Sequence, residues 1–128
     1  MAPIDFQLVT GSIESPPQPP CVVGYGAMLE FLGVVRPSEQ GKSIAAIDYE
    51  AYPAMAQKQG MKLVSEIAAK HKLLALHVIH RIGIVPCGEI SLRVRVWSSH
   101  RGEGFAACSE LIERLKQDIP IWKHPRES

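Results

Sequence analysis

The chain has 128 residues, of which 46% are hydrophobic, so residues 1–128 are predicted to form a single domain with one core. With 14 Lys and Arg against 13 Asp and Glu, the formal net charge is only +1, which excludes a global basic field for nucleic acid or an anionic membrane. Any binding of an anion must therefore depend on a local group of residues.

The three cysteines, Cys21, Cys87 and Cys108, are far apart and lack the C-x-x-C spacing of a zinc site or a redox pair. This favours a reduced, cytosolic setting. The N-terminus has no signal-peptide pattern, and no stretch reaches the roughly 18 apolar residues of a membrane span. The histidines show no i,i+4 pair or carboxylate pattern of a zinc site, so no metal and no cofactor are predicted.

In the first third of the chain, residues Ile4–Val9 form a short, half-apolar opening, and the proline-rich segment Ser15–Pro20 is predicted to be a surface connection. Residues Gly26–Val35 carry apolar side chains on both faces, which predicts a strand covered on both sides. Arg36-Pro37 ends this strand, so the arginine falls at its end.

The polar segment Ser38–Ser43 is predicted to be a loop before a second strand, Ile44–Tyr52, in which apolar and acidic residues alternate. Pro53 then opens a helix that continues through Lys72. Its apolar residues recur at spacings of three and four, so one helical face should lie on the sheet: Ala56, Gly60, Leu63, Val64, Ile67 and Ala68.

Residues Leu73–Ile84 are predicted to be a third strand, and the turn Val85–Gly88 connects it to a fourth, Glu89–Trp97. In the fourth strand one face is aliphatic and the other carries cations and an aromatic ring; the first comprises Ile90, Leu92, Val94 and Val96, the second Arg93, Arg95 and Trp97.

Gly102–Lys116 returns to helical spacing, with Phe105, Cys108, Ile112 and Leu115 predicted on its apolar face, and Pro120 stops it. The C-terminal segment Ile119–Ser128 is predicted to be irregular. Because strands and helices do not alternate strictly, the pattern favours an α+β sandwich over a doubly wound parallel sheet.

The most informative local motif is Ser98-Ser-His-Arg101, where a strand ends and a helix begins. Free amides at a helix N-terminus bind anions, and His100 and Arg101 would add charged donors, which suits a phosphate-bearing ligand. The alternative is that the serines cap the helix and the His-Arg pair is solvated surface. Arg36 and the pair His80-Arg81 also fall in or just after strands, so several cations could converge at one end of the sheet.

Lys116 and Lys123 are candidates for acid-base or nucleophilic chemistry. A lysine packed beside apolar surface and other cations loses solvation for its charged form, which lowers its pKa and makes it a usable base. The alternative is that Lys116 favours the negative end of its helix and Lys123 is an ordinary tail residue. Cys108, on an apolar helical face, and Cys87, in a turn, are not predicted to be nucleophiles.

A set of motifs resembles, in order and spacing, the catalytic subunit of molybdopterin synthase between about Gly26 and Lys123. The motifs are Phe31-Leu-Gly-Val-Val-Arg36, Glu50-Ala-Tyr-Pro53, His80-Arg-Ile-Gly83, Gly88-Glu89, Ser99-His-Arg101, Phe105, and Leu115-Lys116 through Pro120-Ile-Trp-Lys123. The resemblance implies an α/β-hammerhead-like fold with two main helices packed on a mixed or antiparallel sheet.

The resemblance also implies a sulfurtransferase of molybdenum cofactor biosynthesis that converts cyclic pyranopterin monophosphate into molybdopterin. The sulfur would come from a small ubiquitin-like carrier subunit with a C-terminal Gly-Gly thiocarboxylate. Two large subunits would form a homodimer, with a carrier at each end of the resulting heterotetramer.

By the same resemblance, Lys116 lies beside the inserted thiocarboxylate tail and Lys123 near the pterin. Arg36, His100 and Arg101 would bind the substrate, with the His-Arg pair reaching across the dimer, and Phe31 would form an apolar wall of the substrate-binding pocket. Arg81 and Arg126 are further candidates, Arg126 because its surroundings resemble those of an arginine in the longer tail of relatives.

Two other functions remain open. A relative with a shortened C-terminus would bind the carrier without turning over substrate. A small RNA-binding domain would use Arg93, Arg95 and the strand-end cations, with Trp97 as its stacking platform.

Overall fold

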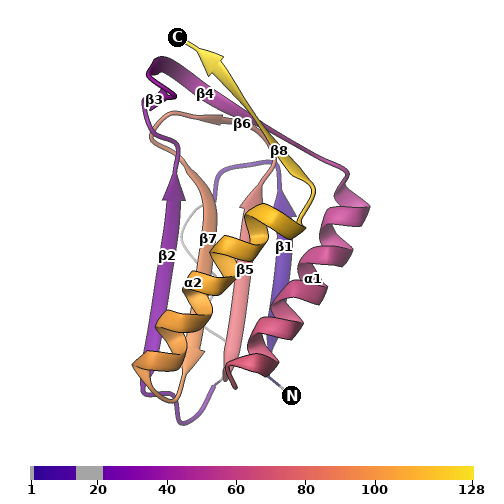
Figure 1. Cartoon of the computed structure of the whole chain (residues 1–128), viewed down its shortest axis with the longest axis vertical. Coiled ribbons are helices and arrows are strands. Elements are labelled where there is room, and N and C mark those ends of the chain that lie inside the picture. The colour runs from indigo at the N-terminus through magenta and orange to yellow at the C-terminus, as the bar shows by residue number, and fades with distance from the viewer. Residues whose placement is uncertain (1, 14–21) are drawn as a thin grey trace.

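The computed structural model describes residues 2–13 and 22–128 (Figure 1). The prediction of a surface connection at residues 15–20 and the position of Cys21 lie outside these ranges. Four strands form the main sheet, in the order β1 (Ile4–Val9), β5 (Ala75–Arg81), β7 (Ile90–Ser98) and β2 (Ala27–Val34). β1 and β5 are parallel and the other pairs antiparallel, so the sheet is mixed.

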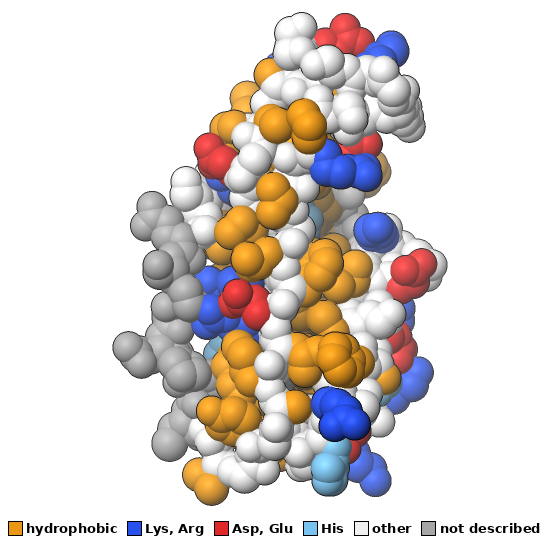
Figure 2. All heavy atoms as spheres, turned by 90° about the vertical axis from the view of Figure 1, so that its left-hand side faces the viewer, with side chains coloured by type: hydrophobic (Ala, Val, Ile, Leu, Met, Phe, Trp, Pro, Cys, Tyr) orange, Lys and Arg blue, Asp and Glu red, His pale blue; other side chains and the backbone are white. Residues whose placement is uncertain are grey.

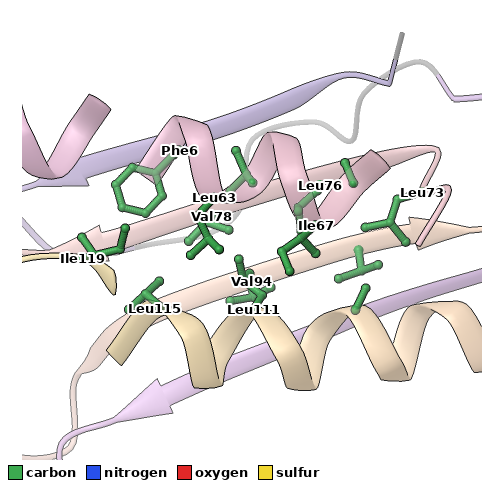
Figure 3. Packing of buried hydrophobic residues seen from close by; sticks show 14 of the residues in the cluster. Phe6, Leu63, Ile67, Leu73, Leu76, Val78, Val94, Leu111, Leu115 and Ile119 are labelled. Carbon is green, nitrogen blue, oxygen red and sulfur yellow. The ribbon is translucent and has the colours of Figure 1, made fainter. Parts of the chain in front are cut away.

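Two helices, α1 (Pro53–Lys70) and α2 (Arg101–Asp118), lie side by side on one face of this sheet. Their apolar faces and the facing side chains of the strands form the main core (Figure 3), which includes Phe6, Leu63, Ile67, Leu76, Val78, Val94, Leu111 and Leu115. The α+β architecture predicted from the sequence is confirmed. Among the described residues, neither helix is long and apolar enough to span a membrane.

The predicted first helix is confirmed, and all six residues expected on its inner face are buried. Pro53 stands in its first turn, where a missing amide hydrogen costs nothing. After the C-cap His71, Lys72 adopts the left-handed region (φ 52°), and Leu73 N donates to Ala68 O at 2.9 Å. This closing pattern satisfies the last carbonyl groups and directs Leu73 into the core.

The predicted inner face of the second helix is confirmed at Leu115 and in part at Cys108 and Ile112, which pack partly buried against the core, and it is wrong at Phe105. The buried positions of α2 are Gly104, Ala107, Leu111 and Leu115, whereas Phe105 is 61% exposed. A side chain at Gly104 would meet Leu29 and Ser98, so only glycine allows the first turn of α2 to approach β2 and β7 this closely. That close approach sets which face of α2 is buried.

A second, smaller sheet is built on β4 (Lys42–Ala51). This strand pairs antiparallel with β3 (Ser38–Glu39), β6 (Gly83–Pro86) and β8 (Ile121–Glu127). Three predictions are corrected here. The polar loop 38–43 is a tight hairpin, the predicted strand 73–84 is divided at Gly83 (φ 86°) between the two sheets, and the C-terminal segment is a strand. β8 was missed because its apolar and polar residues do not alternate, and its pairing with β4 supplies the order.

The prediction that the strand at residues 26–35 is covered on both faces is also wrong. β2 lies at one edge of the main sheet, and Met28, Leu32 and Val34 are each more than 40% exposed. The central strand β7 is the one buried on both faces, since Arg93, Arg95 and Trp97 are all less than 10% exposed. Trp97 is therefore not available as a stacking platform, and the RNA-binding interpretation loses its aromatic support.

Candidate functional site

A hollow of about 670 Å³ lies where the main sheet, the second sheet and the C-terminal part of α2 meet. Six elements contribute to it, because the chain crosses between the two sheets at this place. Its lining residues are Phe31, Leu32, Gly33, Val34, Arg36, Tyr49, His80, Ser91, Leu92, Ile112, Leu115, Lys116, Ile121 and Lys123.

Three of the cations predicted from the sequence, Arg36, Lys116 and Lys123, line this one hollow. Lys116 lies in the last turn of α2, and Lys123 lies on β8, opposite Tyr49 of β4. The seven-residue step between the two lysines contains the helix end and the turn at Ile119 and Pro120, so the chain reverses between them. Within the described part of the chain no acidic residue lines the hollow, which favours an anionic ligand.

The desolvation expected for the lysines is not present in the single chain. The side chain of Lys123 is 47% exposed and Lys116 is also exposed. Lys123 Nζ instead contacts Glu39 Oε1 at 2.7 Å, and the same carboxylate lies 3.8 Å from Arg36 Nη2. The ammonium group of Lys123 holds the pKa of Glu39 below its ordinary value, so Glu39 stays ionised.

His80 is the buried titratable group of the hollow. Its Nδ1 lies 2.8 Å from the backbone carbonyl oxygen of Arg81, which only an N–H can approach favourably. Burial lowers the pKa of His80, and the hydrogen bond to Arg81 opposes this shift. A neutral ring with its proton on Nδ1 keeps Nε2 as an acceptor. The ring packs edge-on against Tyr49, at 5.1 Å between centroids.

Two of the candidate arginines do not line the hollow. Arg81 is buried, donates to Glu89 Oε1 at 2.6 Å and binds the carbonyl oxygen of Ile84. Arg126, on β8, donates to Asp48 Oδ2 at 2.7 Å. In the single chain both have structural ion pairs.

His100 and Arg101 lie at the opposite end of α2 from Lys116. Helical rise of about 1.5 Å per residue puts Arg101 about 22 Å from Lys116 along the axis. The alternative in which the serines cap this helix does not hold, because His100 is the N-cap, with no side-chain cap, and Ser98 Oγ donates to its carbonyl oxygen at 2.7 Å. His100 Nδ1 lies 3.0 Å from Glu103 Oε1.

The apolar wall of the hollow continues onto the molecular surface. Phe31 lines the hollow and is 37% exposed, and its strand, β2, has no further strand on its outer side in the described part of the chain. Figure 2, which looks onto this edge, shows hydrophobic side chains gathered along the face with basic side chains around them. An exposed apolar sheet edge is typical of an interaction surface.

Three residues of the site were not predicted from the sequence as site residues. Tyr49 could have been found, because its alternation with Asp48 and Glu50 places it on the face of Ile47. The motif around His80 suggested a cation at the end of a strand, whereas burial of this side chain favours a neutral imidazole ring. Glu39 gave no sequence signal, since its role depends on a contact with Lys123, 84 positions away.

The MoaE protein family model matches residues 2–118. The chain belongs to the MoaE family. This MoaE-family chain is 41% identical to the molybdopterin synthase catalytic subunit of Thermoplasma volcanium and 39% identical to that of Homo sapiens. Each alignment spans 98 residues, which is 77% of this chain. These alignments cover 72% and 52% of the two relatives, and the chain spans about half the length of the rice relatives that it matches.

Solved structures share the fold of this MoaE-family chain. Molybdopterin synthase from Staphylococcus aureus has a TM-score of 0.87 at 30% identity, covering 96% of this chain and 91% of that one. A Helicobacter pylori structure, a complex of subunits 1 and 2 of molybdopterin-converting factor, has a TM-score of 0.73 at 20% identity, covering 94% of this chain and 83% of that one.

Proposed function

We propose that this chain is the catalytic subunit of a molybdopterin synthase. It would transfer sulfur from a thiocarboxylated carrier to cyclic pyranopterin monophosphate in the cytosol. The observation that carries the proposal is that Arg36, Lys116 and Lys123 line one hollow in a chain of the MoaE family. The motifs that resemble the synthase subunit thus supply the positive charge of one site, as an anionic substrate requires.

The lining residues suit the separate tasks of such a reaction. Arg36 would bind the phosphate group, since a guanidinium offers several donors in one plane. Phe31 would pack against the pterin ring. Lys116 would stabilise the oxyanion that forms when the thiocarboxylate is attacked, and Lys123 would transfer a proton near the pterin. No step requires a bound metal or cofactor from this chain.

The carrier would insert its C-terminal tail into the hollow beside Lys116. The hollow is open to solvent on a surface that has exposed apolar side chains, as a protein partner with an extended tail requires. The fold is compatible with such a partner, because the Helicobacter pylori structure with the same fold is a two-subunit complex.

A second copy of the chain would complete the site. In the register of β2 with β7, Ala27 lies opposite Ser98, so His100 and Arg101 are near the start of β2, while the hollow lies at its end. Antiparallel pairing of two β2 edges about a two-fold axis would bring the start of one strand beside the end of the other. Each hollow would then receive His100 and Arg101 from the other copy.

Reconstitution tests the proposal. The purified chain, a thiocarboxylated small subunit and cyclic pyranopterin monophosphate should yield molybdopterin, and Lys116→Ala should abolish most of the turnover. Lys58→Ala, which removes an exposed lysine of α1 outside the hollow, is the matched control and should retain activity. Carrier binding without product would indicate instead a non-catalytic relative, and unchanged turnover by Lys116→Ala would refute the assigned role of Lys116.

A further inference from the structure

Glu39 lies in a short hairpin beside two residues that line the hollow, Arg36 and Lys123. It is the last residue of β3 and pairs with Lys42 of β4 across a two-residue turn, Gln40-Gly41. Both turn residues have positive φ, 51° and 78°, which is the geometry that joins antiparallel strands most tightly. The turn therefore fixes the register of Glu39 opposite Lys42.

The carboxylate of Glu39 contacts two of the three cations that line the hollow. Oε1 lies 2.7 Å from Lys123 Nζ, and Oε2 lies 3.8 Å from Arg36 Nη2. The side chain of Glu39 is only 14% exposed, whereas those of Lys123 and Arg36 are 47% and 72% exposed. One shielded anion thus bridges two cations that remain accessible to a ligand.

We infer that Glu39 is a positioning residue: it holds Lys123 at the hollow and serves as the internal counter-ion that an anionic substrate displaces. This inference rests on the proposed function and extends it to a residue that the sequence motifs do not contain. A phosphate-bearing substrate must compete with Glu39 for Arg36 and Lys123. The carboxylate consequently weakens binding of the anion while it keeps the amine of Lys123 in a defined place.

The two effects of Glu39 predict that its replacement lowers two kinetic constants, KM and kcat, for separate reasons. Replacement by glutamine removes the competing charge, so the substrate should bind more tightly and KM should fall. The neutral amide holds the ammonium group less firmly, so Lys123 should be less well placed and kcat should also fall. A purely structural ion pair that only attaches the hairpin to β8 predicts neither change.

The chain contains a matched control for the structural explanation. Lys42 and Glu127 form a second ion pair between the hairpin and β8, at 3.5 Å, and neither residue lines the hollow. Both side chains are about 70% exposed. Glu127→Gln therefore removes an acidic residue that also links the hairpin to β8, without changing the charges that face the substrate.

The first experiment uses the chain alone, with inorganic phosphate as the probe, and does not depend on turnover. Glu39→Gln should tighten phosphate binding by about twofold to fivefold, the range expected when one accessible ion pair is removed. It should also speed acylation of Lys123 at fixed pH, measured by peptide mass spectrometry. Glu127→Gln should change neither quantity.

The second experiment measures KM and kcat in the reconstituted system, where Glu39→Gln should lower both and Glu127→Gln neither. The inference is overturned if Glu39→Gln leaves phosphate binding and Lys123 acylation unchanged, if Glu127→Gln shifts them equally, or if neither protein binds phosphate. A chain that binds phosphate as expected but yields no molybdopterin would refute the proposed function and support the displacement by Glu39.

Discussion

Arg101 and Lys116 lie on the same helix, but they cannot serve the same hollow within one chain. Their separation of 15 positions corresponds to about 22 Å along α2, and only Lys116 lines the hollow. If both residues act on one substrate, Arg101 must come from a second copy. The perturbation that tests this places Arg101→Ala in one copy and Lys116→Ala in the other.

The expected magnitude follows from counting intact sites. A homodimer of either variant has two defective sites, and loss of one charge-assisted contact from arginine should lower kcat/KM by about tenfold to a hundredfold. In the mixed dimer, one hollow would have both lesions and the other would have none. Purified mixed dimers should therefore regain about half of the wild-type activity.

The assay requires two affinity tags, so that dimers with one copy of each variant can be isolated before reconstitution with carrier and substrate. The control is a dimer in which one copy carries both changes and the other copy carries none. This control should retain about half of the activity if each hollow is made by a single chain. Shared sites would leave that dimer with two defective hollows. Mixed dimers no more active than the variant homodimers would refute the shared site.

Two further predictions concern stability. Gly60→Ala should lower the free energy of unfolding by about 1–2 kcal/mol, because the added methyl group would collide with the buried ring of Phe6 and this outweighs the gain in helix propensity. Acidification below pH about 6.5 should also destabilise the chain, because burial lowers the pKa of His80 and of His77 in the folded state. The unfolded state then binds more protons, so the stability present above that pH is lost as the pH falls toward the folded pKa values.

Urea unfolding with matched variants measures both effects. Gly102→Ala, at a helical glycine with open space around it, should be neutral or slightly stabilising, and an equal loss in both variants would contradict the contact with Phe6. His80→Gln should reduce the slope of stability against pH between 7 and 5 by at most about 1.4 kcal/mol per pH unit. A slope identical to wild type would show that His80 is not the group that titrates.

Sequence motifs predicted which residues line the hollow better than they predicted how those residues are arranged. Lys116, Lys123, Arg36 and Phe31 were found through ordered motifs, and all four line the hollow. The pair His100-Arg101 was found through the same motifs, and the structure places it at the far end of α2. Whether that pair serves the site depends on a second copy, which no spacing within one chain can encode.

The sequence by itself determined the α+β class, the inner face of α1 and the positions of both helices, because these depend on local periodicity and on the chemistry of proline. Only the tertiary structure decided the strand at the C-terminus, the edge position of β2 and the contact of Glu39 with Lys123. Strand pairing and ion pairs join residues far apart in the chain, so the fold must bring the partners together before either interaction exists.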